Sequence, residues 1–312
     1  MQKQTRQTRN ECNRREMLKT LGLGVGAASL ATPVGRAAPV RRLKVGQTSI
    51  NWGFKVESVE PGLRDSAKLG YWGYESYNDA VEPIDENPGW GKLLEQYKIP
   101  MPSSYFNFNL TDPAVRKAQV EKATRMGKIL KKQGGITAVI GPNGVNRTTY
   151  DFKAAKNDLV TTLNEVSKAL ADLGLAAALH QHTGTCVDTR DQVYAVFDAV
   201  DTRVVKFGPD VGQLQKSGTD PVPILKDFQS LLRTIHVKDY IGERAWAGYC
   251  PLGMGKVDLP AVMDVLEKAD GLHWVMVELD GTANAPMAPF ECARTSRDYL
   301  MKLGYTFRPE TA

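Results

Sequence analysis

The stretch Leu179-His180-Gln181-His182-Thr183-Gly184-Thr185 decides the fold of this chain. It follows a run of small apolar residues, 175–179, which predicts a short buried strand. Side chains two positions apart on a strand point the same way, so His180 and His182 are expected to face one site at the carboxyl end of this strand. Parallel barrels carry their chemistry at that end of the strands. The stretch therefore predicts a site for metal binding or catalysis on a parallel α/β fold.

Three further apolar runs end in a residue that can bind a metal. These residues are Asp210, His236 and Glu278. Together with His180 they offer two imidazoles and two carboxylates at four strand ends, which is a metal-ligand set. Such a set suits one divalent ion, Mn²⁺, Co²⁺, Zn²⁺ or Fe²⁺, and the residue types do not choose among these metals.

Short apolar runs alternate with longer helical patterns over residues 38–312, which favours a parallel α/β architecture. We predict eight strands, over residues 43–50, 71–76, 99–105, 136–140, 175–182, 204–210, 234–238 and 273–278. The clearest helical patterns cover residues 113–133, 152–173, 259–269 and 286–303. Eight alternations without an internal linker or repeat predict a single (β/α)8 TIM barrel. A doubly wound open sheet is the alternative, but no Gly-x-Gly-x-x-Gly turn follows the first strand to support a dinucleotide site.

The amino terminus is expected to be an export signal. Asn13-Arg14-Arg15-Glu16-Met17-Leu18-Lys19 matches the twin-arginine pattern, and a weakly hydrophobic run, 20–32, follows it. We expect cleavage near Ala37, so that residues 1–37 form the signal peptide and residues 38–312 the barrel. The protein would then act in the periplasm or outside the cell, without a stable membrane anchor after cleavage.

The charge balance of the barrel argues against a nucleic-acid partner. Seven of the 40 basic residues and two of the 35 acidic residues lie before residue 38, which leaves 33 of each in the barrel. A nucleic-acid partner would be expected to select a basic surface. We therefore expect a small-molecule partner, and the sequence leaves open whether the barrels form a homo-oligomer.

Three motifs, taken in order, resemble the xylose isomerase-like barrel superfamily. They are His236-Val237-Lys238-Asp239, Gly253-Met254-Gly255-Lys256-Val257-Asp258 and Val277-Glu278-Leu279-Asp280. This superfamily includes sugar phosphate isomerases and epimerases, hydroxypyruvate isomerase, inosose dehydratase and the type IV apurinic endonucleases. The resemblance covers nearly all of the barrel and implies the same fold, with one divalent metal ion at the carboxyl ends of the strands.

The resemblance also implies which residues hold the metal. The family's ligands on the last three strands match Asp210, His236 and Glu278, whereas His180 stands where the family usually has a glutamate. His180 either binds the metal directly or is reserved for proton transfer. The endonucleases hold three zinc ions with further histidines, and this chain has Gln213 where one of those histidines would lie. We therefore set the endonuclease activity aside.

Proton transfer next to a carbonyl is the chemistry that the remaining branches share. Glu278 is a candidate base, His182 a second acid-base candidate, and Lys238 a residue that holds or protonates a substrate oxygen. In the alternative interpretation, Lys238 and Asp239 form an exposed ion pair.

Four other residues are expected to contact the substrate. Glu75 would bind hydroxyl groups, although it is nearly as well suited to capping a helix. The aromatic residues Trp52, Tyr105 and Trp246 would form an apolar wall against a sugar ring; in the alternative interpretation, Trp52 and Trp246 pack at the rim of the barrel.

These inferences predict a metal-dependent isomerase, epimerase or lyase that acts on a non-phosphorylated sugar or keto-sugar through an enediolate. One alternative is an enzyme like inosose dehydratase, or one that eliminates a group from a 3-keto-glycoside. The other alternative is a carbohydrate-binding protein without catalytic activity.

Overall fold

The computed structural model describes residues 41–243, 245–280 and 285–310, without the side chains of residues 245 and 246. The chain divides into two units, residues 1–37 and 38–312, and all described residues belong to the second. The expected signal peptide and its cleavage site therefore lie outside the described residues. Within the described ranges, we find no helix that is both long and apolar enough to cross a membrane.

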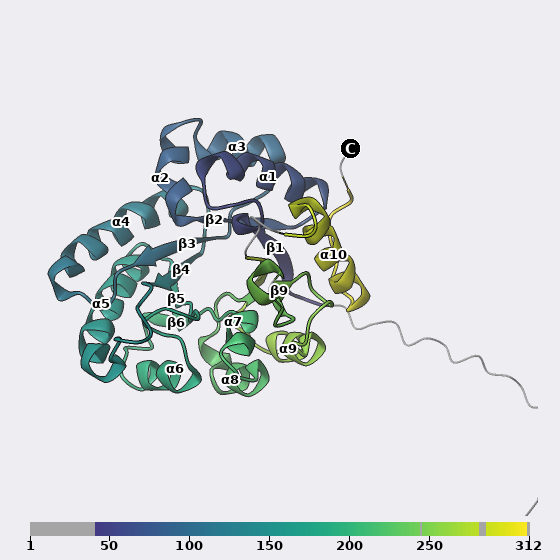
Figure 1. Cartoon of the computed structure of the whole chain (residues 1–312). Helices are drawn as coiled ribbons and strands as arrows, with labels where there is room; N and C mark the ends of the chain where they lie inside the picture. Colours follow the sequence, from purple (N-terminus) through teal and green to yellow (C-terminus); the bar gives the residue numbers. More distant parts are fainter. Residues whose placement is uncertain (1–40, 244, 281–284, 311–312) are drawn as a thin grey trace, which may run out of the picture. The chain divides into compact units, whose positions relative to one another are not determined.

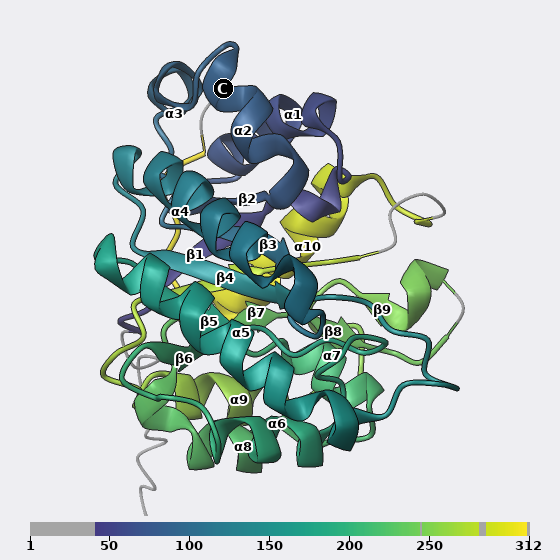
Figure 2. The same ribbon diagram turned by 90° about the vertical axis from the view of Figure 1, so that its left-hand side faces the viewer.

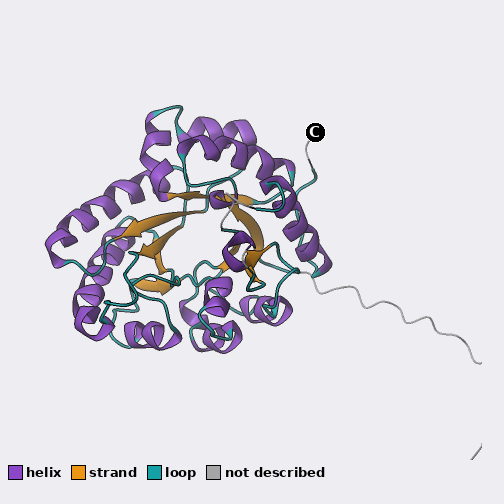
Figure 3. Ribbon diagram, in the orientation of Figure 1, coloured by secondary structure: helices purple, strands orange, loops and turns teal. Residues whose placement is uncertain are grey.

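Eight parallel strands form a single curled sheet, in the order β6-β5-β4-β3-β2-β1-β10-β7 (Figure 1). Their bounds are β1 Lys44–Thr48, β2 Gly73–Tyr77, β3 Ser103–Phe108, β4 Thr137–Pro142, β5 Ala176–Leu179, β6 Val205–Phe207, β7 His236–Val237 and β10 Trp274–Val277. Each corresponds to one of the eight predicted strands. Helices surround the curled strands (Figure 3), which confirms the predicted α/β barrel.

The seam between β6 and β7 is the weakest part of the sheet. Only isolated bridges join the two sides, Phe207 to Leu232 and Asp210 to His236. Pro209 has no backbone N–H, so it accepts a hydrogen bond from the backbone of His236 and donates none. This is why β6 ends three residues before the predicted limit at residue 210.

Ten α-helices lie within the described residues, and most of them connect consecutive strands. Their bounds are α1 Val59–Lys68, α2 Asn78–Glu86, α3 Trp90–Tyr97, α4 Arg116–Lys132, α5 Phe152–Asp172, α6 Arg190–Phe197, α7 Val211–Lys216, α8 Pro221–Asp227, α9 Leu259–Leu266 and α10 Pro289–Lys302. Short 3-10 turns accompany them: η1 Ser49–Asn51, η2 Val56–Ser58, η3 Pro113–Val115, η4 Gln229–Leu231 and η5 Ala245–Gly248. Helices α4 and α5 lie side by side on the outer face of the sheet in both views (Figures 1 and 2).

Side chains at the helix starts explain several of these boundaries. Thr189 and Gln192 form a capping box at the start of α6. Asp258 accepts a hydrogen bond from the backbone of Ala261 at the start of α9. These caps satisfy backbone N–H groups that have no partner inside the helix.

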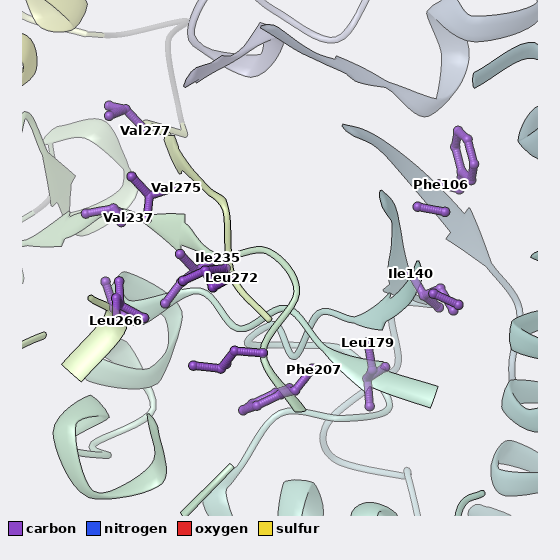
Figure 4. Close-up of a cluster of buried hydrophobic side chains, with 14 of the residues drawn as sticks. Phe106, Ile140, Leu179, Phe207, Ile235, Val237, Leu266, Leu272, Val275 and Val277 are labelled. Atoms are coloured by element: carbon purple, nitrogen blue, oxygen red, sulfur yellow. The ribbon is translucent and has the colours of Figure 1, made fainter. Parts of the chain in front are cut away.

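The core fills the space between the sheet and its helices (Figure 4). The labelled side chains in this view come from β3 to β7, β10 and α9 or from residues next to these elements. The strands β4 and β5 are buried almost throughout, as expected for parallel strands that are covered on both faces. This core holds the carboxyl ends of the strands in a fixed arrangement around one cavity.

A short antiparallel ribbon, which the sequence did not predict, follows β7. Strand β8, Asp239–Tyr240, pairs with β9, Tyr249–Cys250. Its strands have only two residues each, too few for an alternating pattern to show. The ribbon brings Tyr249 to the wall of the cavity.

Candidate active site

A cavity of about 460 Å³ lies at the carboxyl ends of the strands. Its lining includes Thr48 at the end of β1, Glu75 on β2, Tyr105 on β3, His180 after β5 and Glu278 after β10. The cavity is where the fold class keeps its active sites.

His236 lies at the base of the site between two glutamates. Its Nε2 atom is 2.6 Å from Oε1 of Glu75, and its Nδ1 atom is 2.6 Å from Oε2 of Glu278. All three side chains are buried. Burial lowers the pKa of His236, but the two carboxylates raise it more strongly, so that its pKa lies well above the usual value. Ser103 donates a hydrogen bond to the other oxygen of Glu75 and so holds that carboxylate in place.

Lys238 is fully buried and is surrounded by acidic groups. Its ammonium lies 2.7 Å from Asp210, 2.6 Å from Glu278 and 2.8 Å from Asp280. Burial lowers the pKa of Lys238, and the three carboxylates raise it to well above its usual value. Lys238 and Asp239 are therefore not an exposed ion pair, which corrects that alternative interpretation.

Glu278 is the residue that the two cations share. Burial raises its pKa, but His236 and Lys238 lower it more, so that the pKa of Glu278 lies well below the usual value. The carboxylate is therefore held in its charged form, which favours binding to a cation over taking up a proton.

The backbone partners of His180 and His182 define their tautomers. Nδ1 of His180 lies 3.1 Å from the carbonyl oxygen of Gly208, and Nδ1 of His182 lies 2.8 Å from that of Thr183. A carbonyl oxygen only accepts hydrogen bonds, so in both rings the proton is assigned to Nδ1 and the lone pair to Nε2. Burial and the neighbouring His236 hold the pKa of His180 well below its usual value, which keeps that ring neutral.

Gln213 fixes the surroundings of His182. Its amide nitrogen lies 2.7 Å from Nε2 of His182 and donates to Asp280 at 3.1 Å. Its amide oxygen accepts a hydrogen bond from the hydroxyl of Thr183 at 2.6 Å. Gln213 thus links the imidazole to the acidic groups around Lys238.

The donor atoms fit a divalent cation. Two groups place their possible ligand atoms within 4.8 Å of one another: His180, Asp210 and His236 form the first, and Glu75, His236 and Glu278 the second. With Asp280, four carboxylates face two cations, Lys238 and His236, which leaves an excess of two negative charges. A metal-binding imidazole is neutral, so with His236 as a ligand the excess is three negative charges, of which a divalent cation would balance two.

The aromatic residues expected to face a sugar ring lie in different places. Tyr105 lines the cavity, with its ring edge-on to His180. Trp52 does not line it, because its indole donates to Asp65 of α1 at 2.9 Å and the ring packs outside this cavity. The side chain of Trp246 lies outside the described residues. Phe54 and Tyr77 occupy the wall that we had assigned to Trp52.

Several site residues were not predicted in the roles that the structure gives them. Glu75 contacts His236, and Gln213 contacts His182. Asp280 was noted only as the last residue of the motif 277–280, and no sequence pattern indicated a role for Tyr249. A polar residue two positions after Glu278, on the same face, is the one sign that could have identified Asp280.

Asp239 closes the loop that carries the glycine motif. Its carboxylate accepts hydrogen bonds from the backbone N–H groups of Gly253, Gly255 and Val257, at 3.0, 2.8 and 3.1 Å. A Cβ atom on Gly255 would lie 2.2 Å from the carboxylate, so only glycine allows this close approach. The motif is therefore a turn organised by Asp239.

Comparisons with known proteins identify the family and the fold. Inosose dehydratase of Clostridium botulinum (strain Alaska E43 / Type E3) is 24% identical over 293 residues, which cover 83% of this chain and 96% of that enzyme. The probable 3-DHS dehydratase AsbF from Bacillus anthracis has a similar structure, with a TM-score of 0.70 and 14% identity over 83% of this chain and 99% of that one. The IOLI protein, solved with a bound zinc atom, has a TM-score of 0.69 and 19% identity over 84% of this chain and 98% of that one. Residues 63–303 match the family described as xylose isomerase-like TIM barrel, and the chain therefore belongs to this family.

Proposed function

We propose that this protein is a metal-dependent dehydratase that acts on a polyhydroxylated ketone, an inosose or a keto-sugar. The observation that carries this proposal is a set of three buried hydroxyl groups on residues that line the cavity. Those of Thr48, Ser76 and Tyr249 make no hydrogen bond of normal geometry to the described residues. Buried polar groups are normally paired, so these three favour a ligand that carries several hydroxyl groups. The relative named inosose dehydratase supports the same class of substrate.

The metal would be held by His180, Asp210, His236 and Glu278, with Glu75 beside His236. The imidazole of His180 is already neutral, and that of His236 would lose a proton on binding the metal. Two imidazoles and two carboxylates suit zinc, manganese, cobalt or iron, and the zinc atom of the IOLI structure supports such a site. When bound, the ion would polarise the carbonyl group of the substrate and lower the energy of the enolate form.

His182 is the residue we assign to proton transfer. It lines the cavity, and its Nε2 atom carries the lone pair when Nδ1 donates to Thr183. This lone pair accepts a hydrogen bond from the amide of Gln213 at 2.7 Å, which the substrate C–H group would have to displace. Dehydration breaks the C–H bond next to the carbonyl and the C–O bond on the following carbon, and forms a C=C bond between them. We propose that Nε2 takes the proton and then returns it to the departing hydroxyl, which leaves as water.

Lys238 and Glu278 would support this step without exchanging protons. The three carboxylates around Lys238 take up the three N–H donors of its ammonium, and Lys238 does not line the cavity, so its role is to neutralise and position Asp210, Glu278 and Asp280. The lowered pKa of Glu278 makes it a ligand for a cation. The depressed pKa argues against our sequence-based assignment of Glu278 as the base.

The same residues also allow isomerisation or epimerisation. If the proton returns to carbon instead of the leaving hydroxyl, no bond to oxygen breaks and the product is an isomer. Identifying the product therefore distinguishes dehydration from isomerisation or epimerisation.

We further propose that residues 1–37 direct export by the twin-arginine route, so that the barrel acts in the periplasm or outside the cell. Sugar phosphates are scarce there, which favours a non-phosphorylated substrate. Amino-terminal sequencing of exported protein tests this proposal, and retention of Met1 would contradict it.

The activity is tested by NMR of the metal-analysed protein in D2O with inososes, free keto-sugars and their glycosides. A dehydratase converts one of them to a product lighter by one water. The variant His182→Gln should keep its metal and lose activity by about 100-fold or more, the usual contribution of a general acid-base group. Binding of these compounds without hydrogen exchange or product would instead support a carbohydrate-binding protein.

A further inference from the structure

Three aromatic rings run from the base of the cavity to its mouth. Tyr105 contacts His180 with a centroid distance of 5.3 Å, and Tyr77 stacks on Tyr105 at 5.4 Å with an interplanar angle of 11°. Phe54 lies edge-on to Tyr77, also at 5.4 Å. The candidate metal ligands are therefore connected to the surface by a continuous aromatic wall.

Phe54, the outermost ring of this wall, is unusually exposed to solvent for a large apolar side chain. Its exposed fraction is 48%, and few other large hydrophobic residues among those described are exposed to a similar degree. Exposed apolar surface marks a ligand-binding groove when it is contiguous, and Phe54 is contiguous with the apolar residues Trp52 and Pro61.

A second hollow, of about 490 Å³, begins on the other side of Phe54. Phe54 belongs to the lining of both the catalytic cavity and this hollow, and Trp52 and Pro61 contribute further apolar surface to the hollow. The indole N–H of Trp52 already donates to Asp65, so the ring offers an apolar face and no free donor.

The loop that presents Phe54 is held in place before any ligand binds. The hydroxyl of Ser58 lies 3.0 Å from the carbonyl oxygen of Gly53 and 2.6 Å from that of Lys55. Gly53 has a φ of 132°, which side chains other than glycine rarely adopt, and this residue turns the chain just before Phe54. A preorganised wall of this kind reduces the entropy cost of binding.

We propose that Phe54, Trp52 and Pro61 form an outer subsite that takes the aglycone or second sugar ring of a keto-glycoside, while the keto-sugar itself occupies the inner cavity. The faces of a sugar ring carry C–H groups with a partial positive charge, and the faces of aromatic rings are negative, so the two attract each other. A free inosose has no second ring and would leave the outer subsite unused. This inference rests on the proposed function for the inner cavity and narrows its substrate class to glycosides.

Binding measurements test the subsite independently of turnover. The probes are glucose and p-nitrophenyl β-D-glucopyranoside, which differ in the nitrophenyl group, and binding is followed by calorimetry with the full-length mature protein. The aryl glucoside should bind more tightly, and Phe54→Ala should weaken it about tenfold, the size expected for the loss of one aromatic contact. The affinity for glucose should change less than twofold. Phe54→Trp should restore the preference, because it keeps an aromatic face.

Met301→Ala is the matched control, since Met301 is also an exposed apolar residue, 52% exposed, but lies on α10 outside both hollows. It should change neither affinity. Equal binding of both probes by the unmodified protein would overturn the inference, as would an equal effect of Phe54→Ala on both.

The outcome also separates this inference from the proposed function. If free keto-sugars are dehydrated while Phe54→Ala has no selective effect, the subsite is wrong and the function stands. If the aryl preference depends on Phe54 but no compound is converted, the subsite stands and the dehydratase activity is wrong.

Discussion

Replacing Lys238 by Met removes the ammonium from the centre of the site while keeping a side chain of similar length. The side chain of Lys238 has no exposed surface, and its ammonium lies within 2.8 Å of Asp210, Glu278 and Asp280. The ring of Tyr249 lies on another side, 4.7 Å from the ammonium. The variant therefore leaves three carboxylates without their shared cation.

We expect the metal-free variant to lose about 3–5 kcal/mol of unfolding free energy, the range found when one partner of a buried ion pair is removed. Methionine fills most of the space of the lysine stem, so lost packing contributes little. The desolvation cost of Lys238 disappears with its charge, but the three acidic groups remain buried and unpaired. The loss should shrink at pH 5, because removing the ammonium raises the pKa of Glu278 and Asp210 and lets them take up protons.

Urea unfolding after treatment with a chelator measures this effect, at pH 7.5 and at pH 5. Lys168→Met is the control, because Lys168 pairs with Asp172 on the exposed surface of α5. That variant should lose less than about 0.5 kcal/mol. A loss for Lys238→Met no larger than for Lys168→Met would refute the reasoning that the buried ammonium neutralises the site.

Three further predictions follow from the same contacts. Glu75→Gln weakens the hydrogen bond that orients His236 and should lower metal affinity about 10- to 100-fold in a chelator competition, while an unchanged affinity would exclude this orienting role. Asp239→Ala removes the acceptor for three backbone N–H groups in the turn 253–257 and should cost about 3 kcal/mol in urea unfolding, at about 1 kcal/mol for each hydrogen bond. Stability of the metal-free protein should be highest between about pH 4.5 and 6.5. Because the pKa of Glu278 is lowered, the stability that this carboxylate contributes is lost as the pH falls below that window. Because the pKa of His236 is raised, the stability that this imidazolium contributes is lost as the pH rises above the window. A series of thermal melts from pH 3.5 to 9 without such a maximum would contradict both shifts.

The strands were predictable because each is a short apolar run bounded by turn residues, and all eight predicted strands are present. The ends of β6 and β7 were less predictable, because hydrogen bonding to a neighbouring strand decides where a strand stops. Pro209 shows this, since its missing N–H matters only beside His236.

The site was predictable to the extent that its residues end strands. His180, Asp210, His236 and Glu278 follow from the rule that parallel strands bring their carboxyl ends together. Gln213 was noted only as a missing histidine, and its contact with His182 depends on how α7 packs, which no local pattern encodes.

The sequence by itself determined the alternation of strands and helices, the residues at the strand ends and the resemblance to one family, because periodicity and spacing are local properties of the chain. Only the tertiary structure decided which charges meet. It placed Lys238 among three carboxylates, set Glu75 against His236, and moved the aromatic wall from Trp52 to Phe54 and Tyr77. These contacts join residues that are far apart in the chain, so their protonation and their partners follow from distances and burial that exist only after folding.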